Sequence, residues 1–167
     1  MYSILVVDDE AELRKQIVSL LSEKGYEVDE ASDGLEACEK LAKKNYPLVL
    51  CDVRMPKMTG LEFLRYVREN EFSTAVALIT AHGNIRDAIE AIREGAFDYI
   101  EKPINEATLM QLVEKAERAF YMIYRISYSA PVLNQGDGGQ GCVGTSRSMK
   151  RVFQLVERLT RVNTSVL

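Results

Sequence analysis

The sequence has no long apolar run and few cysteines. No stretch of its 167 residues approaches the roughly 20 apolar residues that a helix needs to cross a bilayer. Met1 leads directly into the short apolar run Ile4–Val7 with no basic segment before it, so we expect no signal peptide. The three cysteines, Cys38, Cys51 and Cys142, match no metal-binding spacing, and we expect them to be reduced thiols. These absences favour a cytoplasmic protein that makes no membrane contact.

Charge is distributed unevenly along the chain. Residues 1–120 hold 23 acidic and 15 basic residues, a net charge of −8, whereas residues 121–167 hold 2 acidic and 6 basic residues, a net charge of +4. No aromatic or glycine-rich binding pattern accompanies the basic tail, which favours a solvated helix face over a nucleic-acid site. The change in composition near residue 120 predicts two different pieces of architecture.

Short apolar runs alternate with helical patterns over the first 120 residues. This alternation predicts βα units on a parallel sheet. Right-handed crossovers then predict an α/β fold, a three-layer α/β/α sandwich. If the first strand is central, the five-stranded parallel sheet has the order 2-1-3-4-5. The strands are expected at Ser3–Val7, Tyr26–Ala31, Leu48–Asp52, Ala75–Thr80 and Asp98–Glu101.

A helical pattern begins near Asn105 and continues beyond residue 120. Six small or apolar residues in it recur at the 3-4-3-4-3 spacing of a heptad seam. Two readings stay open: they pack on their own domain, or they form a dimer interface through a helical extension. The six residues are Leu109, Leu112, Ala116, Ala119, Ile123 and Ile126.

The last 47 residues divide into two expected parts. Residues 121–141 are predicted to be the helical extension and a flexible linker, because the glycine-rich stretch 134–141 lacks the lysine of a phosphate-binding loop. Residues 142–167 start a new amphipathic pattern and end in Ser165-Val166-Leu167. We expect this end to be the first strand of a further domain.

Polar side chains stand at the carboxyl ends of the predicted strands. Asp8 and Asp9 follow the first strand, Asp52 ends the third, Thr80 ends the fourth and Lys102 follows the fifth. Ligands of open α/β sheets bind at this edge. Converging carboxylates repel one another unless a cation lies among them, and a hard dication such as Mg²⁺ prefers oxygen ligands. Taken alone, Asp8, Asp9 and Glu10 would be read as caps of the following helix.

The predicted set contains a nucleophilic carboxylate, a cation site, a hydroxyl donor and an ammonium group. These groups stabilise the charge that spreads over phosphoryl oxygens during in-line transfer. A dehalogenase-like phosphatase would place a second aspartate two positions after Asp52, where this chain has Arg54. A flavodoxin-like nucleotide binder would need a phosphate loop after the first strand, where carboxylates would repel phosphate. Proline follows Lys102, so their peptide bond is a candidate for the cis form.

Residues 1 to about 120 resemble the receiver domain of bacterial two-component response regulators. The motifs are Asp8-Asp9, Asp52-x-x-x-Pro56, Gly60, Thr80 and Lys102-Pro103. The resemblance implies a flavodoxin-like receiver fold in which Asp52 accepts a phosphoryl group from a phosphohistidine of a sensor histidine kinase.

The same resemblance implies a role for each motif residue. Asp9 and Asp52, with the backbone carbonyl of Arg54, would ligate Mg²⁺, and Asp8 would reach the ion directly or through water. Thr80 and Lys102 would contact the phosphoryl group. Tyr99 matches the aromatic residue that swings inward after phosphorylation. His82, beyond Thr80, is either an ordinary loop residue or one that tunes the lifetime of the phosphorylated state. A receiver-like interaction module that is never phosphorylated stays open as an alternative.

The tail carries a second resemblance. Val143-Gly144-x-Ser146-x-x-Met149-x-x-Val152, followed by Val166-Leu167, is similar to the opening of the AAA+ module in NtrC-type activators of sigma-54 transcription. It implies a longer parent protein that binds ATP and DNA and contacts sigma-54 RNA polymerase. The ATP site would lie beyond Leu167, so this chain is not expected to be an enzyme. We expect a homodimer whose pairing changes on phosphorylation.

Overall fold

A five-stranded parallel sheet forms the centre of the molecule, in a computed structural model that describes residues 2–80 and 85–128. The strand order is β2-β1-β3-β4-β5, which confirms the predicted topology. The strands are β1 (Ser3–Val7), β2 (Glu27–Ala31), β3 (Leu48–Asp52), β4 (Ala75–Thr80) and β5 (Asp98–Glu101). The helices are α1 (Ala11–Glu23), α2 (Gly34–Lys43), α3 (Gly60–Glu69), α4 (Ile85–Arg93) and α5 (Glu106–Tyr128).

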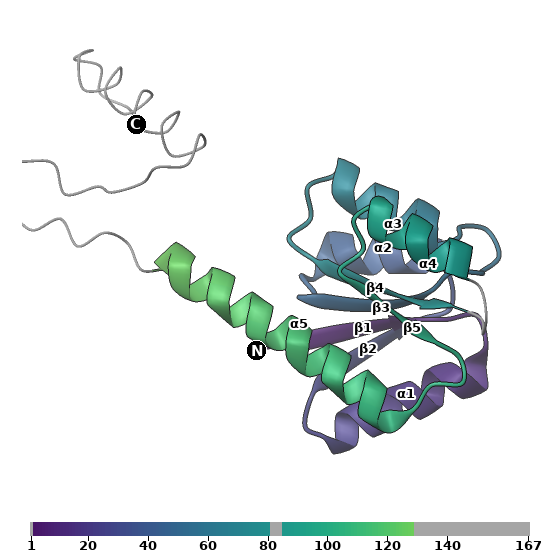
Figure 1. Cartoon of the computed structure of the whole chain (residues 1–167), viewed down its shortest axis with the longest axis horizontal. Helices are drawn as coiled ribbons and strands as arrows, with labels where there is room; N and C mark the ends of the chain where they lie inside the picture. The colour runs from purple at the N-terminus through teal and green to yellow at the C-terminus, as the bar shows by residue number, and fades with distance from the viewer. Residues whose placement is uncertain (1, 81–84, 129–167) are drawn as a thin grey trace, which may run out of the picture. The chain divides into compact units, whose positions relative to one another are not determined.

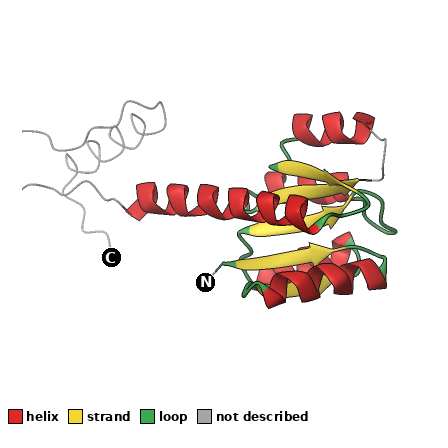
Figure 2. Cartoon of the chain, turned by 60° about the horizontal axis from the view of Figure 1, so that its bottom comes forward, coloured by secondary structure: helices red, strands yellow, loops and turns green. Residues whose placement is uncertain are grey.

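Helices cover both faces of the sheet. Figure 1 shows α2, α3 and α4 on one side of the strands and α1 and α5 on the other, and in Figure 2 the long helix α5 crosses in front of the strands. Leu5, Val7 and Val49 belong to the core on the first side, whereas Ile4 and Val6 belong to the core on the second. Because both faces are buried, the central strands need continuous apolar runs rather than alternating ones.

The register between β1 and β3 aligns the carboxyl ends of these two neighbouring strands. β1 pairs with β3 in parallel, with Val7 opposite Cys51. Asp8 and Asp52 are the next residues of the two strands, so they leave neighbouring strand ends at the same edge of the sheet. The topological switch point of an α/β sheet lies at this place.

The helix ends carry residue types that typically begin or end helices. Asp33 caps α2 by accepting a hydrogen bond from the Glu36 N–H, and Thr59 and Glu62 form a capping box at α3. Gly95 follows α4 with φ of 89°, a left-handed conformation that glycine adopts without a side-chain clash. In residues 2–80 and 85–128, no helix has the length and apolar content that crossing a bilayer requires.

The first part of the heptad seam in α5 packs on its own domain, which is one of the two readings that the sequence left open. Leu109, Leu112 and Ala116 are at most 5% exposed and pack in the core against the sheet. The first half of the predicted seam is therefore unavailable to a second chain while the domain is folded. Ala119 is half-buried and Ile123 is 66% exposed, so the dimer hypothesis is restricted to the far end of the helix. The side chain of Ile126 lies outside the described residues, as do His82 and the whole of residues 129–167.

Aromatic rings attach α5 to the N-terminal part of the domain. The ring of Tyr2 lies 5.5 Å from that of Phe120 and 6.2 Å from that of Tyr26, centroid to centroid. The hydroxyl of Tyr26 donates a hydrogen bond to Glu117 Oε2 at 3.1 Å. The Tyr2 hydroxyl is buried and has no hydrogen-bond partner among the described residues. Two tyrosines of one cluster thus differ in whether their hydroxyl is satisfied.

Removing these two hydroxyls is expected to change stability in opposite directions. Tyr2→Phe should leave the free energy of unfolding unchanged or raise it by up to about 1 kcal/mol, because an unsatisfied buried hydroxyl is lost. Tyr26→Phe should lower it by about 1.5 kcal/mol, because a hydrogen bond to a charged group is lost. Urea unfolding of the two variants tests this. A clear destabilisation by Tyr2→Phe would mean that its hydroxyl has a partner in solution.

Candidate functional site

Four polar side chains from four strand ends meet at the carboxyl edge of the sheet. Lys102 Nζ lies 2.7 Å from Asp52 Oδ1 and 3.1 Å from Asp8 Oδ2. Asp8, Asp52 and Thr80 are 0%, 5% and 1% exposed, so most of the cluster is buried from solvent. The Lys102 N–H donates to the Thr80 carbonyl at 2.8 Å, which brings the ends of β4 and β5 together. The structure thereby brings together four of the residues that the sequence singled out.

The Asp52 carboxylate has a donor at each oxygen. Lys102 contacts Oδ1, and the backbone N–H of Arg54 donates to Oδ2 at 2.6 Å. Burial raises the pKa of Asp52 above its usual value, while Lys102 and the Arg54 N–H act against this rise. Burial alone would lower the pKa of Lys102, but its contacts with Asp52 and Asp8 raise it overall. Lys102 is therefore a charged ammonium at neutral pH.

The raised pKa of Asp52 predicts a specific pH dependence of stability. The folded state binds the Asp52 proton at higher pH than the unfolded state, whose carboxyl titrates near 3.8. Asp52 thus contributes stability that is fully present below pH 3.8 and is lost as the pH rises through the folded pKa. We therefore compare the free energy of unfolding of the wild type with that of Asp52→Asn. The wild-type value minus the variant value should fall as the pH rises from 3.8 through the folded pKa of Asp52, and should stay level above it. Urea unfolding over a pH series measures the difference; a difference that rises with pH would contradict the prediction.

The backbone after Asp52 is held closely by its neighbours. The Val53 N–H donates to the Ile79 carbonyl of β4 at 2.9 Å, and the Gly60 N–H donates to the Val53 carbonyl at 3.0 Å. A Cβ atom on Gly60 would lie 2.3 Å from the Asp52 carbonyl oxygen, a distance that no side chain tolerates. This close approach explains why the sequence has glycine eight residues after Asp52.

Asp8 and Asp9 have different surroundings, although they are adjacent in the sequence. Asp8 is buried, its Oδ1 accepts a hydrogen bond from the Glu10 N–H at 2.8 Å, and Asp9 is exposed. In residues 2–80 and 85–128 no three acidic, cysteine or histidine side chains are placed to hold a metal ion together. The structure therefore shows two carboxylates around one lysine, and ligation by Asp9 stays a prediction.

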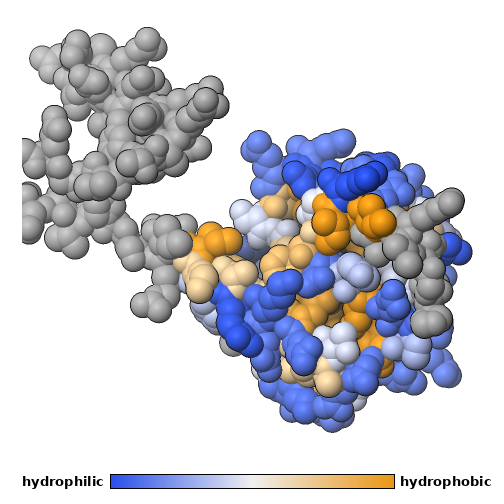
Figure 3. All heavy atoms as spheres, viewed as in Figure 1, coloured by the Kyte–Doolittle hydropathy of each residue, from blue (hydrophilic) through white to orange (hydrophobic). Residues whose placement is uncertain are grey.

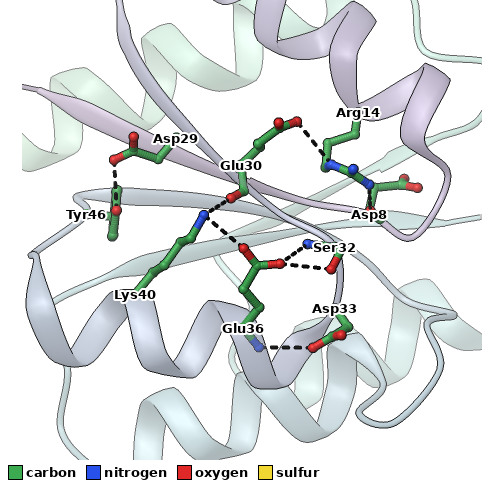
Figure 4. Close-up of polar contacts among 9 residues, drawn as sticks. All are labelled: Asp8, Arg14, Asp29, Glu30, Ser32, Asp33, Glu36, Lys40 and Tyr46. Carbon is green, nitrogen blue, oxygen red and sulfur yellow. Dashed lines mark hydrogen bonds and ion pairs between the residues drawn. The ribbon is translucent and has the colours of Figure 1, made fainter.

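Arg14 is a contributor that the sequence reasoning missed. Its Nη1 donates to the Asp8 carbonyl at 2.6 Å, and its Nε lies 3.1 Å from Glu30 Oε2 (Figure 4). The guanidinium thus connects the end of β1 to β2 and fixes the backbone of Asp8. The available signal was a basic residue in the first turn of α1, where the helix dipole favours acidic residues.

Two buried oxygen atoms at the site lack a well-directed hydrogen bond within the described part of the chain, namely Thr80 Oγ1 and Asp8 Oδ2. Lys102 lies 3.1 Å from Asp8 Oδ2, so this oxygen still has an ion-pair contact. A buried hydroxyl without a partner costs free energy, and a ligand oxygen that accepts from Thr80 would recover it. The arrangement fits a ligand rich in oxygen atoms.

The Lys102–Pro103 peptide bond is cis, as the sequence suggested. Tyr99 lies three residues earlier on β5 and is 40% exposed. Its ring borders a shallow surface hollow that Pro103 and Asn105 also line. The candidate switch residue therefore lies on the outside of the sheet edge in this structure.

Comparisons with known proteins agree with this geometry. Residues 4–114 match the family model of the response regulator receiver domain. The chain is 32% identical to the transcriptional regulatory protein ZraR of Klebsiella oxytoca over 164 residues, which are 98% of this chain and 36% of that protein. It is 30% identical to the DNA-binding transcriptional regulator NtrC of Escherichia coli K12, over 98% of this chain and 34% of that protein. The chain thus spans about a third of the length of these relatives.

Solved structures give the same result. NtrX from Brucella abortus superimposes with a TM-score of 0.74 at 31% identity, covering 99% of this chain and 36% of that one. FixJ-N superimposes with a TM-score of 0.67 at 30% identity, covering 71% of this chain and 94% of that one. The strand order, the acidic edge and these similarities lead to one conclusion: the chain belongs to the response regulator receiver domain family, and its relatives are NtrC-type regulators.

Proposed function

We propose that this chain is the phosphoacceptor of a two-component pathway, in which Asp52 takes a phosphoryl group from a phosphohistidine of a sensor histidine kinase. The observation that carries the proposal is the surroundings of Asp52. Its carboxylate is nearly buried at the end of β3 and has an ammonium group at one oxygen and a backbone N–H at the other. Such a carboxylate is a positioned nucleophile next to fixed positive charge.

The transfer exchanges one bond for another. An Asp52 oxygen forms a bond to phosphorus while the bond from phosphorus to the imidazole nitrogen breaks, and that nitrogen then takes up a proton. Lys102 contacts Asp52 and Asp8 before transfer, and we propose that it moves onto the new phosphoryl oxygens, which carry more charge. Thr80, whose hydroxyl has no other hydrogen bond in the described structure, would donate to the same group.

The residues present fit a Mg²⁺ ion. Mg²⁺ commonly binds through one or two carboxylates and keeps several waters, so Asp8 and Asp52 with the backbone carbonyl of Arg54 suffice as protein ligands. Asp8 Oδ2 is a buried oxygen without a well-directed hydrogen bond, which supports this assignment. When bound, the ion neutralises negative charge on the phosphoryl oxygens. Asp9 would take part from the exposed side, directly or through water.

Phosphorylation would act as a switch. We propose that the phosphoryl group draws Thr80 toward it and that Tyr99 turns inward toward the space this movement leaves. We propose that this movement changes how exposed apolar side chains contact a second chain. Ile89 and Ile92 of α4 are 48% and 49% exposed. In Figure 3, orange patches lie over α4 and at the outer end of the described part of α5. Solution scattering with and without beryllofluoride tests this step, and an unchanged dimer would contradict it.

The parent protein is proposed to be an NtrC-type activator that works with sigma-54 RNA polymerase in the cytoplasm. Alignment with ZraR and NtrC extends over 98% of the chain, which supports assigning residues 1–120 to the receiver, 121–141 to the extension and linker, and 142–167 to the start of the AAA+ module. ATP, DNA and polymerase contacts would belong to the remainder of the parent.

Intact mass spectrometry tests the phosphoacceptor proposal. The chain is incubated with Mg²⁺ and a small phosphodonor, and a parallel sample contains a chelator. One added phosphoryl group that depends on Mg²⁺ and is released by hydroxylamine, as an acyl phosphate is, would support the proposal. A folded protein that forms no adduct with any donor would instead favour an interaction module that is never phosphorylated.

A further inference from the structure

The loop that follows Asp52 is attached to the first turn of α2 by an ion pair. Asp33 Oδ1 accepts the capping hydrogen bond from the Glu36 N–H at 2.9 Å, as Figure 4 shows, while its Oδ2 pairs with Lys57 Nζ. The side chain of Asp33 is 7% exposed and that of Lys57 is 62% exposed. One nearly buried carboxylate therefore serves both as a helix cap and as an anchor for the loop.

Lys57 has an unusual backbone conformation. Its φ of 67° lies in the left-handed region, which residues with a side chain seldom adopt. The Met58 N–H donates to the Pro56 carbonyl at 2.8 Å, so the chain reverses sharply at Lys57. A reversal of this kind persists when contacts on either side hold it, and the ion pair to Asp33 is one of them.

The next residue supplies a second, apolar attachment. A Cβ atom on Gly34 would lie 2.7 Å from Met58 Cγ, so the Met58 side chain occupies the space that any other residue at position 34 would need. Met58 Sδ also lies 3.8 Å from Cys38 Sγ, one turn further along α2. Lys57 and Met58 thus attach the loop to α2 through independent contacts.

The attached loop carries the backbone groups of the phosphoacceptor site. Arg54, three residues before Lys57, donates its N–H to Asp52 Oδ2 at 2.6 Å. Its carbonyl is also the proposed metal ligand. A shift of the loop would move both groups relative to the Asp52 carboxylate, although α2 itself contributes no side chain to the site.

We infer that Asp33, through its pair with Lys57, is a positioning residue for phosphoryl transfer that holds the Arg54 backbone against Asp52. This inference rests on the proposed function. The side chain of Asp33 contacts Lys57 and the Glu36 N–H and would act on the site only through the loop of residues 53–59. The N-terminus of α2 thereby couples the β2 side of the domain to the phosphoacceptor.

Asp33→Asn is the direct test, because asparagine keeps the helix cap and removes the charge. In the metal-free protein, hydrogen exchange at the Arg54 amide should become faster while amides in the central strands are unchanged. The dissociation constant for Mg²⁺ should rise by about tenfold, the lower end of the range for groups that orient a metal ligand. The rate of phosphorylation should fall at low Mg²⁺ and recover when Mg²⁺ is saturating.

Two further variants distinguish an effect of the Asp33–Lys57 pair from an effect of removing any surface charge. Lys57→Gln should reproduce these changes, and the double variant should add little to either single one, as expected for two partners of one contact. Lys24→Gln is the matched control, because Lys24 pairs with Glu106 at 2.9 Å on the exposed surface and contacts neither the loop nor the site. It should leave Mg²⁺ binding and Arg54 exchange unchanged.

The outcomes distinguish this inference from the proposed function. Wild-type protein that forms no phosphoryl adduct would overturn the proposed function, while Arg54 exchange and Mg²⁺ affinity would still report on the positioning pair. Unchanged Arg54 exchange and Mg²⁺ affinity in Asp33→Asn would overturn the inference even if the wild type is phosphorylated. Equal acceleration of exchange throughout the domain would also overturn it, because it would indicate a general loss of stability.

Discussion

Replacing Asp52 with asparagine is expected to abolish phosphoryl transfer while the domain stays folded. The amide has nearly the same shape as the carboxylate but is no nucleophile, so incorporation from a small phosphodonor should fall by about 100-fold or more. Folding should persist, because the variant removes a buried charge and leaves Lys102 in contact with Asp8. Intact mass spectrometry and circular dichroism measure the two results.

Asp98→Asn is a matched control for this variant. Asp98 forms an ion pair with Lys115 at 2.7 Å, the same distance that separates Lys102 from Asp52, but on the exposed side of β5. It should be phosphorylated at the wild-type rate. Persistence of a Mg²⁺-dependent adduct in Asp52→Asn would place the phosphoacceptor on another residue and contradict the proposed function.

Replacing Lys102 with methionine is expected to cause the largest loss of stability. Asp8 and Asp52 would lose the ammonium group that lies within 3.1 Å of both, and two nearly buried carboxylates would face each other without a cation. Breaking a buried ion pair by removing one partner costs about 3–5 kcal/mol, and the lower end applies because the Lys102 side chain is 26% exposed. Lys115→Met, which breaks an exposed pair, should cost less than about 1 kcal/mol.

The loss in Lys102→Met should depend on pH and on Mg²⁺. Without the lysine, the pKa of Asp52 rises further, so the variant is least stable where Asp52 is ionised. The difference from wild type should shrink as the pH falls and Asp52 becomes protonated. Millimolar Mg²⁺ should restore part of the stability, because the ion supplies the missing positive charge. A loss that is the same at acidic and neutral pH would show that methionine disturbs packing instead.

The strands were predictable because a sheet covered on both faces requires short, continuous apolar runs. Leu48–Asp52 and Ala75–Thr80 meet that requirement, and turn and cap residues such as Gly95 and Asp33 mark the ends of neighbouring helices. The edge site followed from the same pattern, since parallel strands deliver the residues at their carboxyl ends to one place. Asp52, Thr80 and Lys102 met there as expected.

Contacts between distant segments were not predictable. Asp8 and Asp9 are adjacent in sequence, yet one is buried beside Lys102 and the other is exposed, because the chain leaves the sheet after Val7 and before α1 begins at Ala11. The heptad spacing of α5 continues across the boundary between the buried and the exposed parts of the helix. Spacing shows which residues share a helix face, but what covers that face depends on the sheet.

The sequence by itself determined the class of fold and the four polar residues at the sheet edge, because hydrophobic period and strand-end position are local properties. The strand order was expected from the resemblance to a receiver domain, and the observed pairing of the strands confirmed it. Only the tertiary structure decided the partners: Lys102 between Asp8 and Asp52, Arg14 on the Asp8 carbonyl, and Lys57 on Asp33. These contacts join residues up to 94 positions apart in the chain, so they depend on how the strands pair and how the helices pack.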